Sequence, residues 1–486
     1  NLTTSRYNVL IGDNAGYNLQ QSSANNDNVM IGNDAGYAGD YTWPQATDNV
    51  YVGRSAGRYL DDGYANVAIG KEAGYANSSE GNQSYQSVWI GYQAGYSVTD
   101  SINSVMIGYQ AGKNATTSDG NVAIGYNVLG GATGSALTAG GTTAVGYQAA
   151  GYIDAGSGNG TYIGYQAGLH DINGGNIAIG YNSMHTASGS AMTKNIAIGS
   201  ESQYNISYAS SANNVSLGYQ ALKGGSVTAA VANNVAIGYA ALMDVTSATS
   251  NTAIGGRSAL GNLTTGDNNI AIGDGAGQTM TTSGDCILIG NSAGNVLEGT
   301  GVNGSIAIGN AALATHTDGV RNIAIGWEAM HDTNAGSTSQ GSNDNVFIGY
   351  AAAGGVWANA ESNGNVGIGS YVMDSALDGA LYNTAVGAYA LSAITSADNV
   401  VAIGNSAAYS LTTGANNVAV GRDAMKVHTT GERNIAIGTN AMDDTDAGST
   451  SLGSADNVFM GHNAGGGTWA DAASNYNIGI GNYAMD

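Results

Sequence analysis

The chain has 486 residues, a formal net charge of −23, 77 glycines, 1 proline and 1 cysteine. The acidic balance disfavours nucleic acid, whose phosphates need a Lys/Arg surface, and equally disfavours an anionic membrane surface. No apolar run approaches the length of a membrane-spanning helix, so we expect no membrane insertion of this segment. The single cysteine, Cys286, excludes an internal disulfide framework.

One short motif recurs along the whole chain. It first occurs as NVLIGDNAG at 8–16 and returns in forms such as SVWIGYQAG at 87–95 and NVAVGRDAM at 417–425. Aligned on the glycine after the Ile or Val, it occurs in 26 copies with a mean period of about 19 residues. A period in this range is typical of solenoids. We therefore predict an all-β chain, one continuous parallel β-solenoid of about 26 stacked rungs over residues 1–486.

The residues before the motif glycine predict a short strand. Three residues before it every copy has Val, Ile or Thr, and one residue before it 24 copies have Ile or Val. These two positions share one face of a strand, and the position between them, Ala in 14 copies and never charged, lies on the other. We expect the Val/Ile face to fill the interior of each coil. The Ala-rich face would then lie outside, where further copies of the chain would cover it.

Two further columns predict corners of the coil. Four residues before the glycine, 19 copies have Asn, whose amides can form a ladder from rung to rung. Cys286 stands in this column, and we interpret it as a tolerated replacement and not as a reactive thiol. The glycine itself fits a corner that needs positive φ or a close approach of another backbone.

The repeated N-[VI]-A-[IV]-G-x-x-A unit resembles the head repeats of trimeric autotransporter adhesins, the YadA-like head. It is also similar to the NTxIGYxAG arrays of phage tail-fibre proteins. The resemblance covers the whole chain and implies a left-handed parallel β-roll in which three chains associate side by side. The period here is longer and more variable than in adhesin heads, and the resemblance specifies no ligand.

A block of rungs is duplicated within the chain. Residues 305–374 match residues 417–486 at a constant offset. Copying blocks of rungs lengthens a fibre, whereas an enzyme gains little from it. Because residues 1–12 are similar to residues 262–273, we expect the chain to be a piece of a longer fibre.

The candidate ligand-binding residues are aromatic. Tyrosines follow the motif glycine in six successive rungs. Stacked on each other, they would form either an aromatic stripe that binds sugar rings or a ladder that only stabilises the strand edge or the chain interface. Two tryptophans occupy equivalent loops of the duplicated block, either exposed for binding or folded over the neighbouring coil. These candidates are Tyr92, Tyr109, Tyr126, Tyr147, Tyr165, Tyr181, Trp357 and Trp469.

Catalysis, metal binding and cofactors are not predicted. The six histidines are scattered, without the spacing of a catalytic triad or a metal site. The loops at 332–336 and 444–448 contain part of a calcium-loop pattern but lack its downstream bidentate Glu. We interpret them as solvated turns.

Together these patterns predict a non-enzymatic fibre shaft for attachment to a host or surface, most simply a segment of a phage tail fibre. The alternative is a bacterial surface adhesin or an extracellular filament subunit built from the same roll. Either would be extracellular, on a virion or a cell surface. Its partners would be further copies of itself, three chains as the resemblance implies, and a cell-surface glycan or protein receptor.

Overall fold

A computed structural model describes most of the chain. The described residues are 7–19, 26–39, 46–76, 82–117, 119–131, 138, 140–153, 158–186, 192–297, 303–333, 341–358, 360–444, 453–467, 469 and 473–485. They form two compact units, Asn1–Thr249 and Ser250–Asp486, and each is described by itself. The described residues contain 26 β-strands and no α-helix, which confirms the prediction of an all-β chain.

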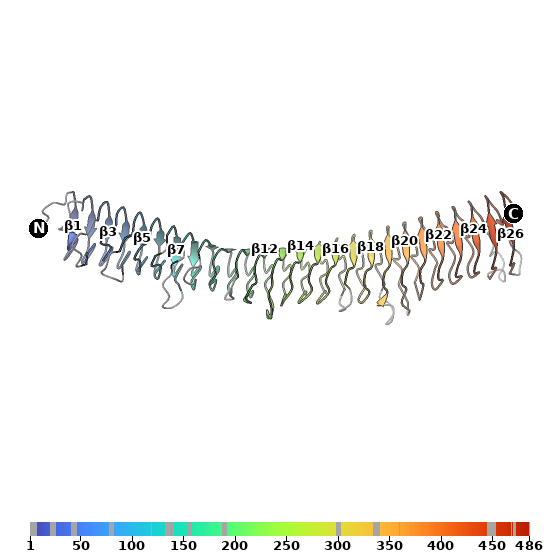
Figure 1. The fold of residues 1–486 in the computed structure, drawn as a ribbon, viewed down its shortest axis with the longest axis horizontal. Coiled ribbons are helices and arrows are strands. Elements are labelled where there is room, and N and C mark those ends of the chain that lie inside the picture. The colour runs from blue at the N-terminus through green and yellow to red at the C-terminus, as the bar shows by residue number, and fades with distance from the viewer. Residues whose placement is uncertain are drawn as a thin grey trace. The chain divides into compact units, whose positions relative to one another are not determined.

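The first unit has one short strand in each rung. Each strand pairs with the next in parallel and in register, so that Val9 lies opposite Val29 and Val29 opposite Val50 (Figure 1). The strands are β1 (Val9–Ile11), β2 (Val29–Ile31), β3 (Val50–Val52), β4 (Val67–Ile69), β5 (Val88–Ile90), β6 (Val105–Ile107), β7 (Val122–Tyr126), β8 (Thr143–Tyr147), β9 (Thr161–Ile163), β10 (Ile177–Ile179), β11 (Ile196–Ile198), β12 (Val215–Leu217) and β13 (Val235–Tyr239).

The second unit repeats this arrangement. Its strands also pair in parallel with the next strand along the chain, as Ile306 does with Ile323. They are β14 (Thr252–Arg257), β15 (Ile270–Ile272), β16 (Ile287–Ile289), β17 (Ile306–Ile308), β18 (Ile323–Ile325), β19 (Val346–Ile348), β20 (Val366–Ile368), β21 (Thr384–Val386), β22 (Val401–Ile403), β23 (Val418–Val420), β24 (Ile435–Ile437), β25 (Val458–Met460) and β26 (Ile478–Ile480).

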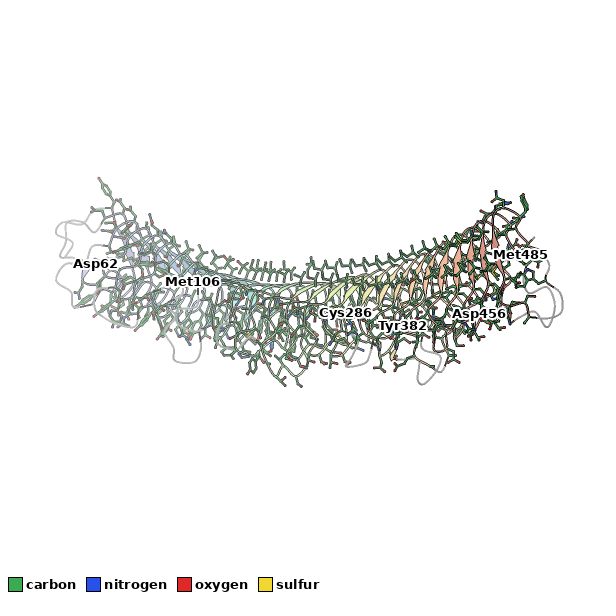
Figure 2. All side chains as sticks on the ribbon, turned by 45° about the vertical axis from the view of Figure 1, so that its right-hand side comes forward. Asp62, Met106, Cys286, Tyr382, Asp456 and Met485 are labelled. Carbon is green, nitrogen blue, oxygen red and sulfur yellow. The ribbon has the colours of Figure 1, made fainter. Side chains whose placement is uncertain are left out.

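In both units the chain returns to the same edge once per rung. Parallel pairing of consecutive strands requires this return, and the described segments that connect the strands run mainly on the side opposite them (Figure 1). Each unit is therefore a parallel β-solenoid, as the repeat predicts. Buried side chains such as Met106 and Cys286 lie within these coils (Figure 2).

The faces of the strand are the reverse of those predicted. The second residue of every strand after β1 is buried, including Ala324 and Ala436, while the residues on either side of it are half-buried or exposed. The Ala-rich column therefore faces the interior, and the two Val/Ile columns face outward. The alternation of side chains along a strand separates its two faces but does not identify the interior one. The prediction chose the Val/Ile face as the interior only because its side chains are bulkier.

The interior of the coil is too narrow for a bulky side chain both on the strand and six residues later in the same rung. Every large residue at the second strand position except Phe347 has a glycine six positions later, and a Cβ added to Gly57 would lie 2.6 Å from the Tyr51 ring. Where the second strand residue is Ala, that later position holds Leu or Met in 8 of 14 rungs, and these Leu and Met residues are buried. Such pairs are Tyr51 with Gly57, Trp89 with Gly95, Tyr162 with Gly168, Ala236 with Leu242, and Ala324 with Met330. The two positions thus share one volume inside the coil.

The asparagine column forms the predicted ladder. The backbone N–H of Asn345 donates to Oδ1 of Asn322 at 3.1 Å, and Nδ2 of Asn345 donates to the same oxygen and to the carbonyl of Ser362. The same pattern links Asn365 to Asn345. These side chains are fully buried, so the ladder satisfies amides that would otherwise be costly to bury.

Cys286 replaces Asn in this ladder. Its backbone N–H donates to Oδ1 of Asn269 at 3.0 Å, so the ladder's backbone bond is kept. The thiol is buried, and burial raises the pKa of Cys286. A buried thiol with a raised pKa has little thiolate, which agrees with the interpretation of a tolerated replacement.

The motif glycines stand where two backbones nearly touch. Gly12 has φ +132°, and a Cβ there would lie 2.5 Å from the carbonyl oxygen of Gly32 in the next rung. Gly32 stands in the same relation to Gly53. Both reasons given by the sequence, positive φ and close approach, therefore hold at this corner.

Candidate interaction surface

The outward Val/Ile columns make an apolar face along the strands of each unit. Their exposed fractions include 39 % at Ile69, 47 % at Leu217 and 42 % at Ile403. None of the 26 strands has a charged residue at either outward position of this motif. We call the side chains three and one residues before the motif glycines the Val/Ile face. A contiguous apolar surface of this kind is typical of a site that another molecule covers.

The sequence contained a signal for this face that the prediction did not use. In most of the 26 rungs, one of the two residues at the second strand position and six positions later is large and the other is small, which indicates that both lie inside. Tyr51 with Gly57 and Ala324 with Met330 are two examples. Positions that exchange volume with each other must be in contact, so the alternate Val/Ile positions must point outward.

The six predicted tyrosines form a continuous stack on the surface. The ring centroids of Tyr126 and Tyr147 are 5.1 Å apart with an interplanar angle of 4°, and those of Tyr147 and Tyr165 are 5.0 Å apart. Tyr92, Tyr109 and Tyr181 continue the same stack. The spacing matches the repeat of about 4.8 Å between parallel strands.

Stacking limits what these rings offer to a ligand. Each inner ring has both faces against its neighbours, so its edge and hydroxyl are what it presents to solvent. At the first ring of the stack, the Lys71 ammonium lies 5.3 Å from the Tyr92 centroid. At the other end Ser200 occupies the position that follows Tyr181. Binding of sugar rings by this column stays a prediction. Tyr181 is the tyrosine of the stack whose next neighbour, Ser200, is too small to cover its ring.

The two tryptophans of the duplicated block lie against their own coil. Trp357 is fully buried, packs edge-on against Phe347 with centroids 6.2 Å apart, and donates from Nε1 to the carbonyl of Ala353. Trp469 is half-buried and makes the same contacts with Phe459 and Gly465. Burial leaves Trp357 no face for a surface ligand, so packing accounts for its presence.

The calcium-loop pattern lies mostly outside the described residues, because 334–340 and 445–450 are not among them. Within the ranges that the structure describes, no group of three or more His, Cys, Asp or Glu side chains could hold a metal ion. In the same ranges, no helix has the length and hydropathy needed to cross a bilayer.

Two histidines are buried at equivalent places in the duplicated block. Nε2 of His316 lies 3.1 Å from Nδ2 of Asn322 and therefore accepts, which leaves the Nδ1 proton to be donated to Oγ1 of Thr333 at 2.8 Å. His428 makes the same contact with Asn434. Burial lowers the pKa of His316 to about 4. These imidazoles are structural parts of the neutral coil interior.

Lowering the pH should destabilise the coil through His316. Below about pH 6.5 the unfolded chain binds a proton that the buried imidazole does not, so the free energy of unfolding falls as pH drops to about 4. A lowering from 6.5 to about 4 corresponds to about 3 kcal/mol. The equivalent position of another rung holds buried Leu411, so His316→Leu is a suitable comparison.

Thermal unfolding followed by circular dichroism between pH 7.5 and 4 checks this expectation. The stability of the parent chain should fall more steeply with decreasing pH than that of His316→Leu. Parallel pH profiles for the two proteins would contradict the assignment of a neutral buried imidazole.

Neither a scan against models of known protein families nor a search of curated proteins found a match to this chain.

Proposed function

We propose that this chain is a non-enzymatic shaft segment of an extracellular attachment fibre, such as a phage tail fibre. The observation that carries the proposal is the Val/Ile face. Half-buried and exposed apolar residues recur on it in rung after rung, without one charged side chain in the motif positions. A face of this kind in a chain of net charge −23 calls for a partner that is equally apolar and equally periodic.

Further copies of the chain are the partner that we propose for this face. Identical chains present the same columns with the same rung spacing, so side chains of one copy can fit between those of another along the whole face. Closed symmetry then covers the face on every copy. Three copies, as the resemblance implies, form the arrangement that we propose.

Other features support the proposal of a fibre shaft. Each rung is joined to the next by parallel strand pairing and by the Asn ladder, as at Asn322 and Asn345. The block 305–374 recurs as 417–486, which is how a shaft would gain length. Such a stack draws its stability from contacts between neighbouring rungs and not from a single globular core. In the proposed fibre it would hold a receptor-binding part, for a cell-surface glycan or protein, away from the virion or cell.

The proposal is tested by placing charges on the Val/Ile face. The variant combines Ile289→Glu, Ile325→Glu and Ile368→Glu, which lie on alternate strands of the second unit so that the new charges are about 10 Å apart. We expect the parent chain to have a mass of several copies by light scattering, and the triple variant to lose that association while keeping its β-type circular dichroism.

The matched control adds three charges at exposed loop positions of the same unit, Thr265→Glu, Thr282→Glu and Thr413→Glu. It should associate like the parent chain. A parent chain that is a stable, folded monomer at micromolar concentration would overturn the proposal.

A further inference from the structure

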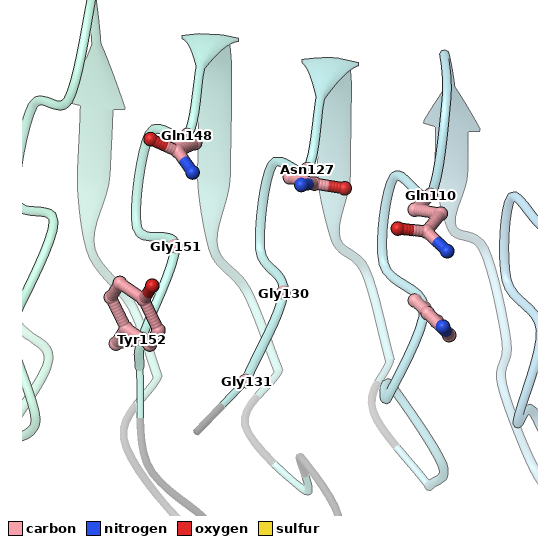
Figure 3. Close-up of a pocket in the computed structure, with 8 residues that line it drawn as sticks. Gln110, Asn127, Gly130, Gly131, Gln148, Gly151 and Tyr152 are labelled. Carbon is pink, nitrogen blue, oxygen red and sulfur yellow. The ribbon is translucent and has the colours of Figure 1, made fainter. Parts of the chain in front are cut away.

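A hollow opens on the surface of the first unit, beside the loops that follow β6, β7 and β8. Its volume is about 200 Å³, below the roughly 300–1,000 Å³ of pockets that enclose a drug-sized ligand, so it suits a single ring. Figure 3 shows Gly130 and Gly131 in the middle rung, with Tyr152 in the rung to one side and Gln110 in the rung to the other. The lining residues are Gln110, Lys113, Asn127, Gly130, Gly131, Gln148, Gly151 and Tyr152.

The hollow exists because one rung lacks a side chain that its neighbours have. Five or six residues after the motif glycine, successive rungs carry aromatic or basic side chains that stack on each other, such as Tyr75 on Tyr96 at 4.9 Å and Tyr152 on His170 at 4.8 Å. The intervening rung has Gly130 and Gly131 at these positions. The stack is therefore interrupted for the thickness of one rung.

One wall of the hollow is an aromatic ring with an unstacked face. Tyr152 is 39 % exposed, and its described ring stacking is with His170, in the rung beyond it. Its opposite face borders the rung of Gly130 and Gly131, and no side chain within the described part of that rung covers it. This differs from the inner tyrosines of the Tyr92–Tyr181 stack, whose two faces are both occupied. A free aromatic face next to polar groups is a surface on which a sugar ring can lie.

The opposite wall carries a positive charge. The ammonium of Lys113 lies 5.9 Å from the Tyr96 centroid on one side and lines the hollow on the other. Among the described residues, no carboxylate lies within salt-bridge distance of Lys113, and none lines the hollow. The rungs of Lys113 and Tyr152 are two steps apart, about 10 Å, which leaves room for one ring with a substituent directed at the ammonium.

The floor offers unpaired amides. Elsewhere the column two residues after the motif glycine is a ladder, in which Nε2 of Gln110 donates to Gln93 at 2.7 Å and Nε2 of Gln166 donates to Gln148 at 2.8 Å. Asn127 is one methylene shorter, and in the described structure it bonds neither Gln110 nor Gln148. The free Oε1 of Gln110 and the free Nε2 of Gln148 therefore face the middle rung as an acceptor and a donor for sugar hydroxyls.

We propose that this hollow binds one acidic sugar residue, a uronic acid of a surface polysaccharide. The apolar face of the sugar ring lies on Tyr152, its hydroxyls bond the amides of Gln110, Asn127 and Gln148, and its carboxylate pairs with Lys113. The inference rests on the proposed attachment function and supplies a ligand class for it. An uncharged sugar would leave the Lys113 ammonium without a partner, and this gives the site its preference.

The test measures binding of methyl β-D-glucuronide and methyl β-D-glucoside to the full chain by saturation-transfer NMR titration. We expect the glucuronide to bind at least ten-fold more tightly than the glucoside. Lys113→Gln should remove the difference between the two sugars, and Tyr152→Ala should abolish binding of both. Gly131→Asn, which refills the middle rung with a residue that tolerates the φ of +70° found there, should also abolish binding.

The second unit provides a matched control. Tyr409, also 39 % exposed, is followed one rung later by Lys426 in the same column, with no glycine rung between them. Tyr409→Ala and Lys426→Gln should leave binding unchanged. Equal affinity for the two sugars, or binding unaffected by Lys113→Gln, would overturn the inference. Light scattering on the same samples separates the two proposals, because a chain that associates but binds no sugar contradicts this inference alone.

Discussion

Replacing Ala324 with glutamate is expected to cost roughly 3–5 kcal/mol, because it places a carboxylate without a partner inside the coil. Ala324 is fully buried and lies between Ala307 and Phe347 of the adjacent strands, with Met330 filling the volume opposite. No space remains for a longer side chain. The measurement is the melting temperature by circular dichroism, together with hydrogen exchange of the amides around β18.

The matched control is the same substitution one residue later, Ile325→Glu, which places the charge on the Val/Ile face. It should change the melting temperature of the coil much less than Ala324→Glu. A second check uses volume: Ala324→Phe should destabilise, and adding Met330→Gly should recover part of the loss, since Phe459 with Gly465 is such a pair. A larger loss for Ile325→Glu than for Ala324→Glu would mean that the Val/Ile face is the interior.

Replacing Gly326 with alanine should be nearly as damaging, at roughly 3–5 kcal/mol. Gly326 has φ +137°, a region that side chains rarely adopt, and an added Cβ would collide with the carbonyl oxygen of Gly349 and lie 2.6 Å from its carbon. Backbone cannot move aside as a flexible side chain can, because Gly349 makes the same approach to Gly369. The strain should therefore spread to the neighbouring rungs.

Gly256→Ala is the control for this substitution, since a Cβ at Gly256 would meet no atom within 4 Å. It lies next to the motif glycine of its own rung, so composition and location are closely matched. We expect its unfolding curve to coincide with that of the parent chain within about 1 kcal/mol. A tolerated Gly326→Ala would show that adjacent rungs are not in such close backbone contact.

The repeat itself determined much of this fold. A period of about 19 residues with β-branched residues two apart predicts a solenoid with one short strand in each rung. Each copy of the repeat must bury its apolar residues against the next copy. The Asn ladder, with Asn345 bonded to Asn322, and the close approach of Gly12 to Gly32 follow from the same logic. Identical residues at identical places in successive rungs must meet each other.

Which face of the strand lies inside was decided only by the tertiary structure. Alternation places Ala324 and Ile325 on opposite faces of the strand, but it does not identify which face is interior. The prediction assigned the bulkier Val/Ile face to the interior, and that assignment was wrong. The return path of the chain brings Met330 into the coil, and the volume left over fits only a small residue on the strand. The hollow beside Tyr152 arises similarly, since two glycines form a site only when the rungs on either side carry Tyr152 and Lys113. The sequence orders residues along each rung, whereas the cross-section of the coil and the contacts between rungs are set by packing in three dimensions.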